Sequence, residues 1–191
     1  MKNKEDIKRL LIVVDMVNGF VRDGIMADCY IEHIVPRLNF IIDSFIYNGD
    51  DIIFIKDSHE LGCKEFDKFP IHCLKNTIES ELIDEFKEYE KYSMVYEKNS
   101  TNAMYAPNFM SDLEKMKSLR EVIVTGCCSD ICVINLAISL VNYFDQRNMD
   151  VIVHSPSNLI ETYNGENHNR NEYNEMALRL MKQSGIKVSE M

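Results

Sequence analysis

The chain has 191 residues and a formal net charge of -10 at pH 7, and this length predicts a single domain over 1–191 with a core that needs no disulfide or structural metal. The acidic charge is spread along the chain without a dense Lys/Arg cluster, which argues against nucleic acid and anionic membranes as partners. Neither a signal peptide nor an apolar run of roughly 20 residues is recognisable. We therefore expect a cytoplasmic protein with a small-molecule ligand, whose 6 cysteines are reduced thiols.

Short β-branched runs alternate with amphipathic stretches, a pattern typical of a parallel sheet covered by helices. We predict an α/β protein, with three α/β/α layers and a six-stranded, mostly parallel sheet. Strands are expected at 9–15, 51–57, 92–98, 121–126, 150–154 and 185–189. Helices are expected after Pro36, within 129–147 and within 170–185, with Gly49 and Gly185 at the ends of the first and the last.

Reactive side chains stand where the predicted strands end. Asp15, Asp57 and Lys98 end the first three strands, and the segment "TGCCSDICV" (125–133) ends the fourth. Ligands of open parallel sheets bind at the carboxyl ends of the strands. Each of these residues alone is more simply explained as a helix cap or a solvated charge, but together they favour a functional site.

Cysteines are concentrated in that last segment. Gly126 permits a tight turn, and Ser129 or Asp130 is a suitable N-cap, so that Cys132 would lie in the first turn of the next helix. The helix dipole would lower the thiol pKa there, which makes Cys132 the best candidate for a nucleophile.

The neighbouring thiols have simpler interpretations. Cys127 and Cys128 are expected to be small residues that let the turn approach a substrate. A zinc or iron–sulfur site is disfavoured because Cys63 and Cys73 lack the matching spacing. A free core cysteine is the alternative interpretation for all three thiols of the segment, Cys132 included.

A second concentration of polar residues lies in the irregular stretch 58–91 and just before it. Asp57 and His59 point the same way along a strand, and Glu65, Asp67 and His72 follow on the loop. Imidazole and carboxylate groups together suit zinc, manganese or iron(II). A solvated, charged loop is the plainer alternative.

Three motifs resemble those of a known family. Asp15 in "LLIVVDMVNGFV", Lys98 in "VYEKNSTNAM" and Cys132 in "VTGCCSDICV" resemble the Asp, Lys and Cys triad of the isochorismatase-like cysteine hydrolases, over nearly the whole chain. The resemblance implies that Asp15 accepts the thiol proton of Cys132 while Lys98 holds the charged pair. It also implies an oxyanion hole formed by the N–H groups of Cys128 and Cys132, and a cis peptide bond between Cys127 and Cys128.

The "DSH" and "FPIHC" elements resemble the metal loop of the nicotinamidases in this family. The resemblance implies one divalent metal ion, zinc before manganese or iron, with four ligands: Asp57, His59, Glu65 and His72. It further implies three aromatic residues around a pyridine ring, each of which has a core aromatic as its alternative: Phe20, Phe69 and Tyr105.

The implied activity is hydrolysis of nicotinamide to nicotinate and ammonia through a cysteine thioester, in NAD salvage. Another small amide, a ureido compound or isochorismate is the alternative substrate, and a non-catalytic binding or redox protein on the same scaffold is the third interpretation. The oligomeric state stays open, although homo-oligomers are common among proteins of this fold.

The chain departs from the family pattern at three places. His154-Ser155 stands where Asp-Ala is frequent, Asn174 stands where a histidine is frequent, and Asn76 replaces a glycine before Thr77. These positions bear on substrate preference and on the packing around the triad.

Overall fold

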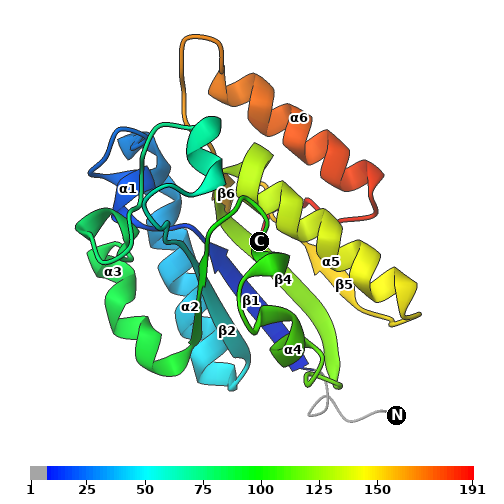
Figure 1. Cartoon of the computed structure of the whole chain (residues 1–191). Helices are drawn as coiled ribbons and strands as arrows, with labels where there is room; N and C mark the ends of the chain where they lie inside the picture. Colours follow the sequence, from blue (N-terminus) through cyan, green and yellow to red (C-terminus); the bar gives the residue numbers. More distant parts are fainter. Residues whose placement is uncertain (1–7) are drawn as a thin grey trace, which may run out of the picture.

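The computed structural model describes residues 8–191, which form a six-stranded sheet between two layers of helices (Figure 1). The strand order is β3-β2-β1-β4-β5, and β6 pairs with β4. All strand pairings are parallel. The strands are β1 (Lys8–Val14), β2 (Asp51–Asp57), β3 (Met94–Lys98), β4 (Leu119–Cys127), β5 (Ile152–His154) and β6 (Ile160–Glu161). The predicted α/β fold class is confirmed.

The central strand β1 shows why the sheet is covered on both faces. Its apolar residues alternate between two cores, with Ile12 and Val14 in one and Leu11 and Val13 in the other. All four side chains are fully buried. A strand that is apolar on both sides is stable only between two layers of helices.

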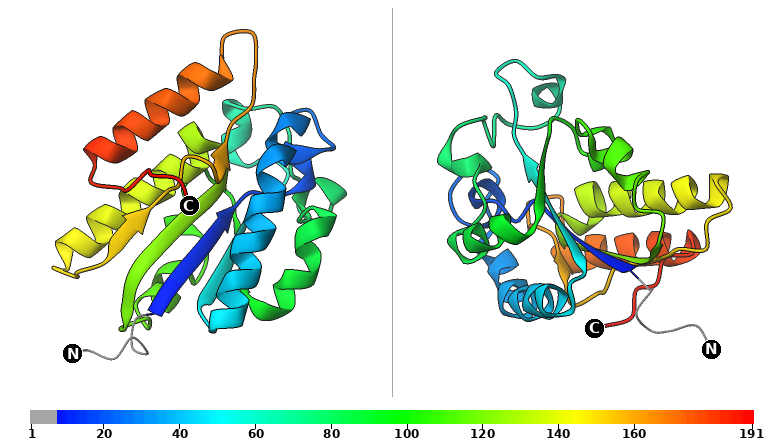
Figure 2. Two further views of the ribbon diagram at one scale, coloured as in Figure 1. Left: turned by 180° about the vertical axis from the view of Figure 1, so that it is seen from behind. Right: turned by 90° about the horizontal axis from the view of Figure 1, so that it is seen from below.

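Helices α2 and α3 cover one face of the sheet, and α4, α5 and α6 cover the other (Figure 2). The helices are α1 (Asn18–Val21), α2 (Val35–Asn48), α3 (Asp84–Lys87), α4 (Phe109–Leu113), α5 (Ile134–Gln146) and α6 (Arg170–Gln183). As predicted, α2 has Pro36 in its first turn and ends at Gly49, which has a positive φ of 70°. No helix within 8–191 is long and apolar enough to cross a membrane.

Short helical turns fill the connections. The 3-10 turns are η2 (Cys29–Ile34), η3 (Lys64–Asp67), η4 (Ile78–Ser80), η5 (Glu88–Tyr92) and η6 (Ala103–Tyr105), and η7 (Ser129–Val133) is a π-type turn that leads directly into α5. Strand β3 starts at Met94 rather than at residue 92 because η5 occupies the residues before it.

The predicted strand at 185–189 is wrong. Those residues make one isolated bridge, between His154 and Lys187, and the sixth strand is β6 instead. The backbone of Lys187 exchanges two hydrogen bonds with the β5 region, at 3.0 Å to Val153 and 2.7 Å from Ser155. β6 was missed because its 2 residues are too few to show a period in the sequence.

Candidate active site

Three of the expected site residues meet at the carboxyl edge of the sheet. Asp15 directly follows β1, Lys98 is the last residue of β3, and Cys132 lies in η7 at the end of β4. Lys98 Nζ lies 2.9 Å from Asp15 Oδ2 and 3.5 Å from Cys132 Sγ. The thiol and one oxygen each of Asp15 and Asp57 lie within 4.8 Å of one another. The parallel topology therefore brings together residues that are far apart in the sequence.

Gly126 allows this convergence. It has a φ of 103°, and a Cβ at this position would overlap the carbonyl oxygen of Val14 on the neighbouring strand. The close approach of β4 to β1 places the turn that carries Cys132 beside Asp15.

The electrostatics of the site are set by Lys98 between two carboxylates. Burial opposes its charge, but Asp15 and Asp57 outweigh burial and raise the pKa of Lys98 well above its ordinary value. Burial likewise opposes ionisation of Asp57, yet the charge of Lys98 holds its pKa below the usual range. Lys98 and Asp57 are thus a buried ion pair, 2.6 Å apart.

Asp15 and Cys132 behave differently. Burial raises the pKa of Asp15 to about 7, against the opposing charge of Lys98. Burial also raises the pKa of the Cys132 thiol well above its ordinary value, and Lys98 only partly offsets this. The expectation of a lowered thiol pKa is therefore wrong, since burial raises this pKa more than the charge of Lys98 lowers it. The resting thiol is protonated and has a carboxylate with a pKa near neutrality close by.

We call η7 the thiol turn (Ser129–Val133). Its N-cap is Cys128, which makes no side-chain capping bond, so the expected cap at Ser129 or Asp130 is wrong. Ser129 donates to Asn174 instead, and Asp130 accepts from two groups beyond the turn. The peptide bond between Cys127 and Cys128 is cis, as the resemblance implied.

A second cluster adjoins Asp57. One ligand atom each of Asp57, His59, Glu65 and His72 lies within 4.8 Å of the others. Asp67 is not part of the cluster, because its exposed carboxylate pairs with Lys64. The structure therefore gathers the four residues that the metal-loop resemblance named.

The hydrogen bonds of the two histidines show that the cluster suits a divalent cation. His59 Nδ1 lies 2.9 Å from Asn99 Oδ1, and His72 Nδ1 lies 2.7 Å from the carbonyl oxygen of Pro70. Since both partners act here as acceptors, each Nδ1 carries the proton and each Nε2 presents a lone pair to the cluster. His59 Nε2 is buried, 3.3 Å from Asp57, and makes no hydrogen bond. Two neutral imidazoles and two carboxylates are a ligand set for zinc, manganese or iron(II).

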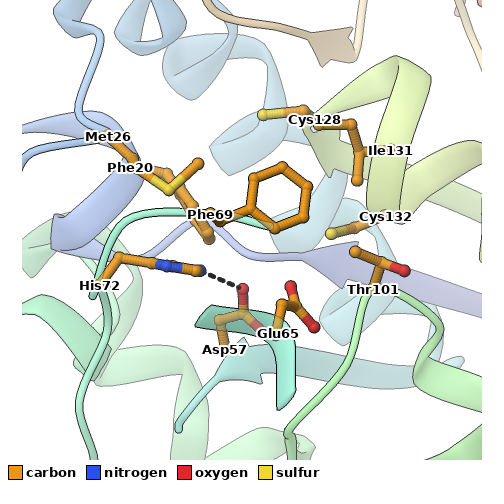
Figure 3. A pocket seen from close by; sticks show the side chains of 10 residues that line it. All are labelled: Phe20, Met26, Asp57, Glu65, Phe69, His72, Thr101, Cys128, Ile131 and Cys132. Atoms are coloured by element: carbon orange, nitrogen blue, oxygen red, sulfur yellow. Dashed lines mark ion pairs between the residues drawn. The ribbon is translucent and has the colours of Figure 1, made fainter. Parts of the chain in front are cut away.

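One cavity joins the thiol to this cluster (Figure 3). Its walls are Phe20, Met26, Asp57, Glu65, Phe69, His72, Thr101, Cys128, Ile131 and Cys132. The rings of Phe20 and Phe69 lie against His72, with centroid separations of 5.5 Å and 6.3 Å. The expected oxyanion residues, Cys128 and Cys132, lie on the opposite side of Figure 3 from His72.

Tyr105 is not part of this wall. Its side chain is 81% exposed, because η6 turns Ala103 and Met104 into the core and directs the next residue outward. Sequence reasoning also missed Met26, Thr101 and Ile131. Ile131 was detectable as the neighbour of Cys132, whereas Met26 lies in an irregular loop that has no periodic signal.

The comparisons with known proteins agree with this geometry. Residues 9–191 match the model of the Isochorismatase domain family, and the chain belongs to this family. It is an isochorismatase-family hydrolase. An uncharacterized isochorismatase family protein, PncA, of Bacillus subtilis is 28% identical over 177 residues, which are 85% of this chain and 91% of the relative. Nicotinamidase 1 of Arabidopsis thaliana is 30% identical over 137 residues, or 64% of this chain and 56% of that protein.

Solved structures share the fold. The crystal structure of nicotinamidase PncA from Bacillus subtilis has a TM-score of 0.81 and 26% identity, and the match covers 96% of this chain and 99% of that one. A pyrazinamidase of Pyrococcus horikoshii, solved in complex with zinc, has a TM-score of 0.78 at 20% identity, with 96% and 99% coverage. The latter identity supports the fold alone.

Proposed function

We propose that this hydrolase is a nicotinamidase, which converts nicotinamide to nicotinate and ammonia in NAD salvage. The observation that carries the proposal is that Cys132 and the metal-competent cluster (Asp57, His59, Glu65 and His72) border the same cavity. A reactive thiol at one end suits a carboxamide, and a cation-binding cluster at the other suits the ring nitrogen of a pyridine. The similarity to the nicotinamidases of Bacillus subtilis and Arabidopsis thaliana supports the same reading.

In this mechanism Asp15 is the base. The Cys132 thiol is protonated at rest, and Asp15, with its pKa near 7, accepts that proton as the sulfur attacks the carboxamide carbon. Lys98 stays charged throughout and stabilises the thiolate at 3.5 Å.

The remaining steps return the proton. The N–H groups of Cys128 and Cys132 would stabilise the tetrahedral oxyanion. Asp15 then gives its proton to the departing ammonia, which leaves an acyl thioester on Cys132. Water attacks the thioester, Asp15 takes the proton from that water, and nicotinate leaves as the thiol is restored.

Asp57, His59, Glu65 and His72 would hold the metal ion, which when bound supplies a Lewis acid for the pyridine nitrogen. Phe20 and Phe69 would confine the ring between this cluster and the thiol. Holding the substrate in one orientation raises the rate, because the entropy of orienting the carboxamide against the thiol is lost on binding and not in the transition state.

The test is ammonia release from nicotinamide by the purified protein, with added zinc, manganese or iron(II), and with Cys132→Ala as control. Release that requires Cys132 and responds to metal is the expected result. No release with any metal would overturn the nicotinamidase assignment, and a panel of small amides, ureido compounds and isochorismate would then identify the substrate class.

A further inference from the structure

His168, in the loop between β6 and α6, is fixed by stacking on both faces of its ring. The ring centroid lies 3.9 Å from that of Tyr163, with the planes 7° apart, and 3.7 Å from that of Tyr173. The backbones of Gly165 and His168 exchange two hydrogen bonds, which close a tight turn in this loop. The edges of the imidazole are therefore aimed at defined partners.

Both ring nitrogens face acceptors. His168 Nε2 lies 2.8 Å from Asp130 Oδ2, and Nδ1 lies 3.0 Å from the carbonyl oxygen of Tyr163. The other oxygen of Asp130 accepts from the hydroxyl of Thr162. The bond between His168 and the Asp130 carboxylate is charge-assisted, and it is shielded from water because the two side chains are only 10% and 6% exposed.

Asp130 belongs to the thiol turn, two residues before Cys132. The backbone of this turn is held by bonds from Ile131 and Val133, both 3.1 Å from the carbonyl oxygen of Cys128. Since the N-cap adds no side-chain bond, the Asp130 carboxylate is a main attachment of the turn to the rest of the protein. Asp15 and Lys98 come from other strands, so a movement of the turn changes their distances to the thiol.

We propose that His168 is a positioning residue, which acts through Asp130 to hold Cys132 at its working distance from Asp15 and Lys98. The inference rests on the proposed role of Cys132 as nucleophile, but not on the identity of the substrate. The hydrogen bonds of His168 go to Tyr163 and Asp130, and neither residue lines the cavity. His168 therefore acts on Cys132 only through the turn. Displacements of about 1 Å in a catalytic group lower rates by up to about 100-fold.

The direct test is the rate at which iodoacetamide alkylates Cys132, followed by peptide mass spectrometry well below the melting temperature. His168→Phe keeps an aromatic ring between the tyrosines and removes both ring nitrogens, while Asp130→Asn is compared with Asp130→Ala. Tyr173→Phe, which keeps the stacking ring, and Tyr89→Phe, which loses a bond to Asp43 of α2, serve as controls.

We expect His168→Phe to change the alkylation rate of Cys132 by about tenfold and to lower kcat with little change in KM, while both controls stay near the wild type. Slower alkylation would show that the Cys132 thiol has moved away from Asp15. Faster alkylation would show that the turn has opened and exposed the thiol to solvent. Asp130→Asn should keep more of the wild-type rate than Asp130→Ala, because the amide oxygen still accepts from His168.

An alkylation rate within about twofold of the wild type, with only the melting temperature lowered, would overturn the proposal. If His168→Phe does not fold, His168→Gln gives the same comparison, since it can satisfy only one of the two acceptors. Because alkylation needs no substrate, wild-type protein that fails to hydrolyse nicotinamide would refute the proposed function and leave this test intact.

Discussion

Lys98 joins the two halves of the site, because its Nζ lies 2.6 Å from Asp57 and 2.9 Å from Asp15. Asp57 belongs to the metal-competent cluster, and Asp15 is the proposed base. The charge state of each half therefore depends on the other through one ammonium group. A change at the cation cluster must alter the proton affinity of the base.

Lys98→Met should abolish activity and destabilise the fold. It leaves two buried carboxylates without their cation, and breaking a buried pair in this way costs about 3–5 kcal/mol of unfolding free energy. Urea unfolding and ammonia release measure the two effects. Lys75→Met is the matched control, since Lys75 is partly exposed in its pair with Glu97 and should cost no more than about 1 kcal/mol. A Lys98→Met protein as stable as the wild type would contradict this account of the pair.

The pH dependence of kcat/KM should show an acidic limb from Asp15. Burial raises the pKa of Asp15 to about 7, and only the ionised carboxylate accepts the thiol proton, so kcat/KM falls as pH drops through this pKa. A cation beside Asp57 weakens the repulsion that Asp57 exerts on Asp15, and the midpoint in the metal-loaded enzyme should thus lie at or below about 7. A pH–rate profile checks this. A limb centred well above neutrality would exclude Asp15 as its origin.

Asn99→Ala should weaken metal binding while Cys132 and Lys98 stay in place. Asn99 accepts the Nδ1 proton of His59 and so keeps the Nε2 lone pair directed at the cluster. Loss of such a partner typically lowers metal affinity by about 10–100-fold. Competition with a chromophoric chelator measures the affinity, and Asn99→Asp, which keeps an acceptor, is the conservative control. Equal affinities in all three proteins would show that the bond does not orient His59.

Gly126→Ala should be far more damaging than Gly49→Ala. Both glycines have a positive φ, 103° and 70°, but a Cβ at Gly126 overlaps the backbone of Val14, whereas nothing lies within 4 Å of one at Gly49. We expect about 1 kcal/mol of destabilisation at Gly49 and at least about 3 kcal/mol at Gly126, with loss of activity. Thermal and urea unfolding decide the comparison. Similar losses at both positions would show that conformational strain alone matters.

The elements predicted best from the sequence are those with long apolar periods. An apolar run followed by a polar residue or a glycine marks three of these elements. They are the strands that end at Asp57 and Lys98 and the helix that ends at Gly49, and the structure has their ends at these residues. The exceptions are short or irregular. β6 has only 2 residues, and the loop that carries Met26 has no period, so tertiary contacts decide their conformation.

The site shows the same division. Asp15, Lys98 and Cys132 could be named from motifs at strand ends, but the position of Tyr105 depends on which way a single 3-10 turn rotates. The pKa of Cys132 could not be read from its place in a helix, because desolvation depends on everything that surrounds the thiol. His168 carried no signal, since its partners Asp130 and Tyr173 are brought to it only by the folded chain.

The central position of β1 has a consequence for how the protein is made. β1 precedes both of its partners in the chain: it pairs on one side with β2, which starts at Asp51, and on the other with β4, which starts at Leu119. During translation the apolar β1 therefore keeps one edge unpaired until β4 has left the ribosome. An open apolar edge of this kind is a site for aggregation and for chaperone binding. The yield of folded protein in a cell should accordingly depend on how well that edge is shielded before β4 arrives.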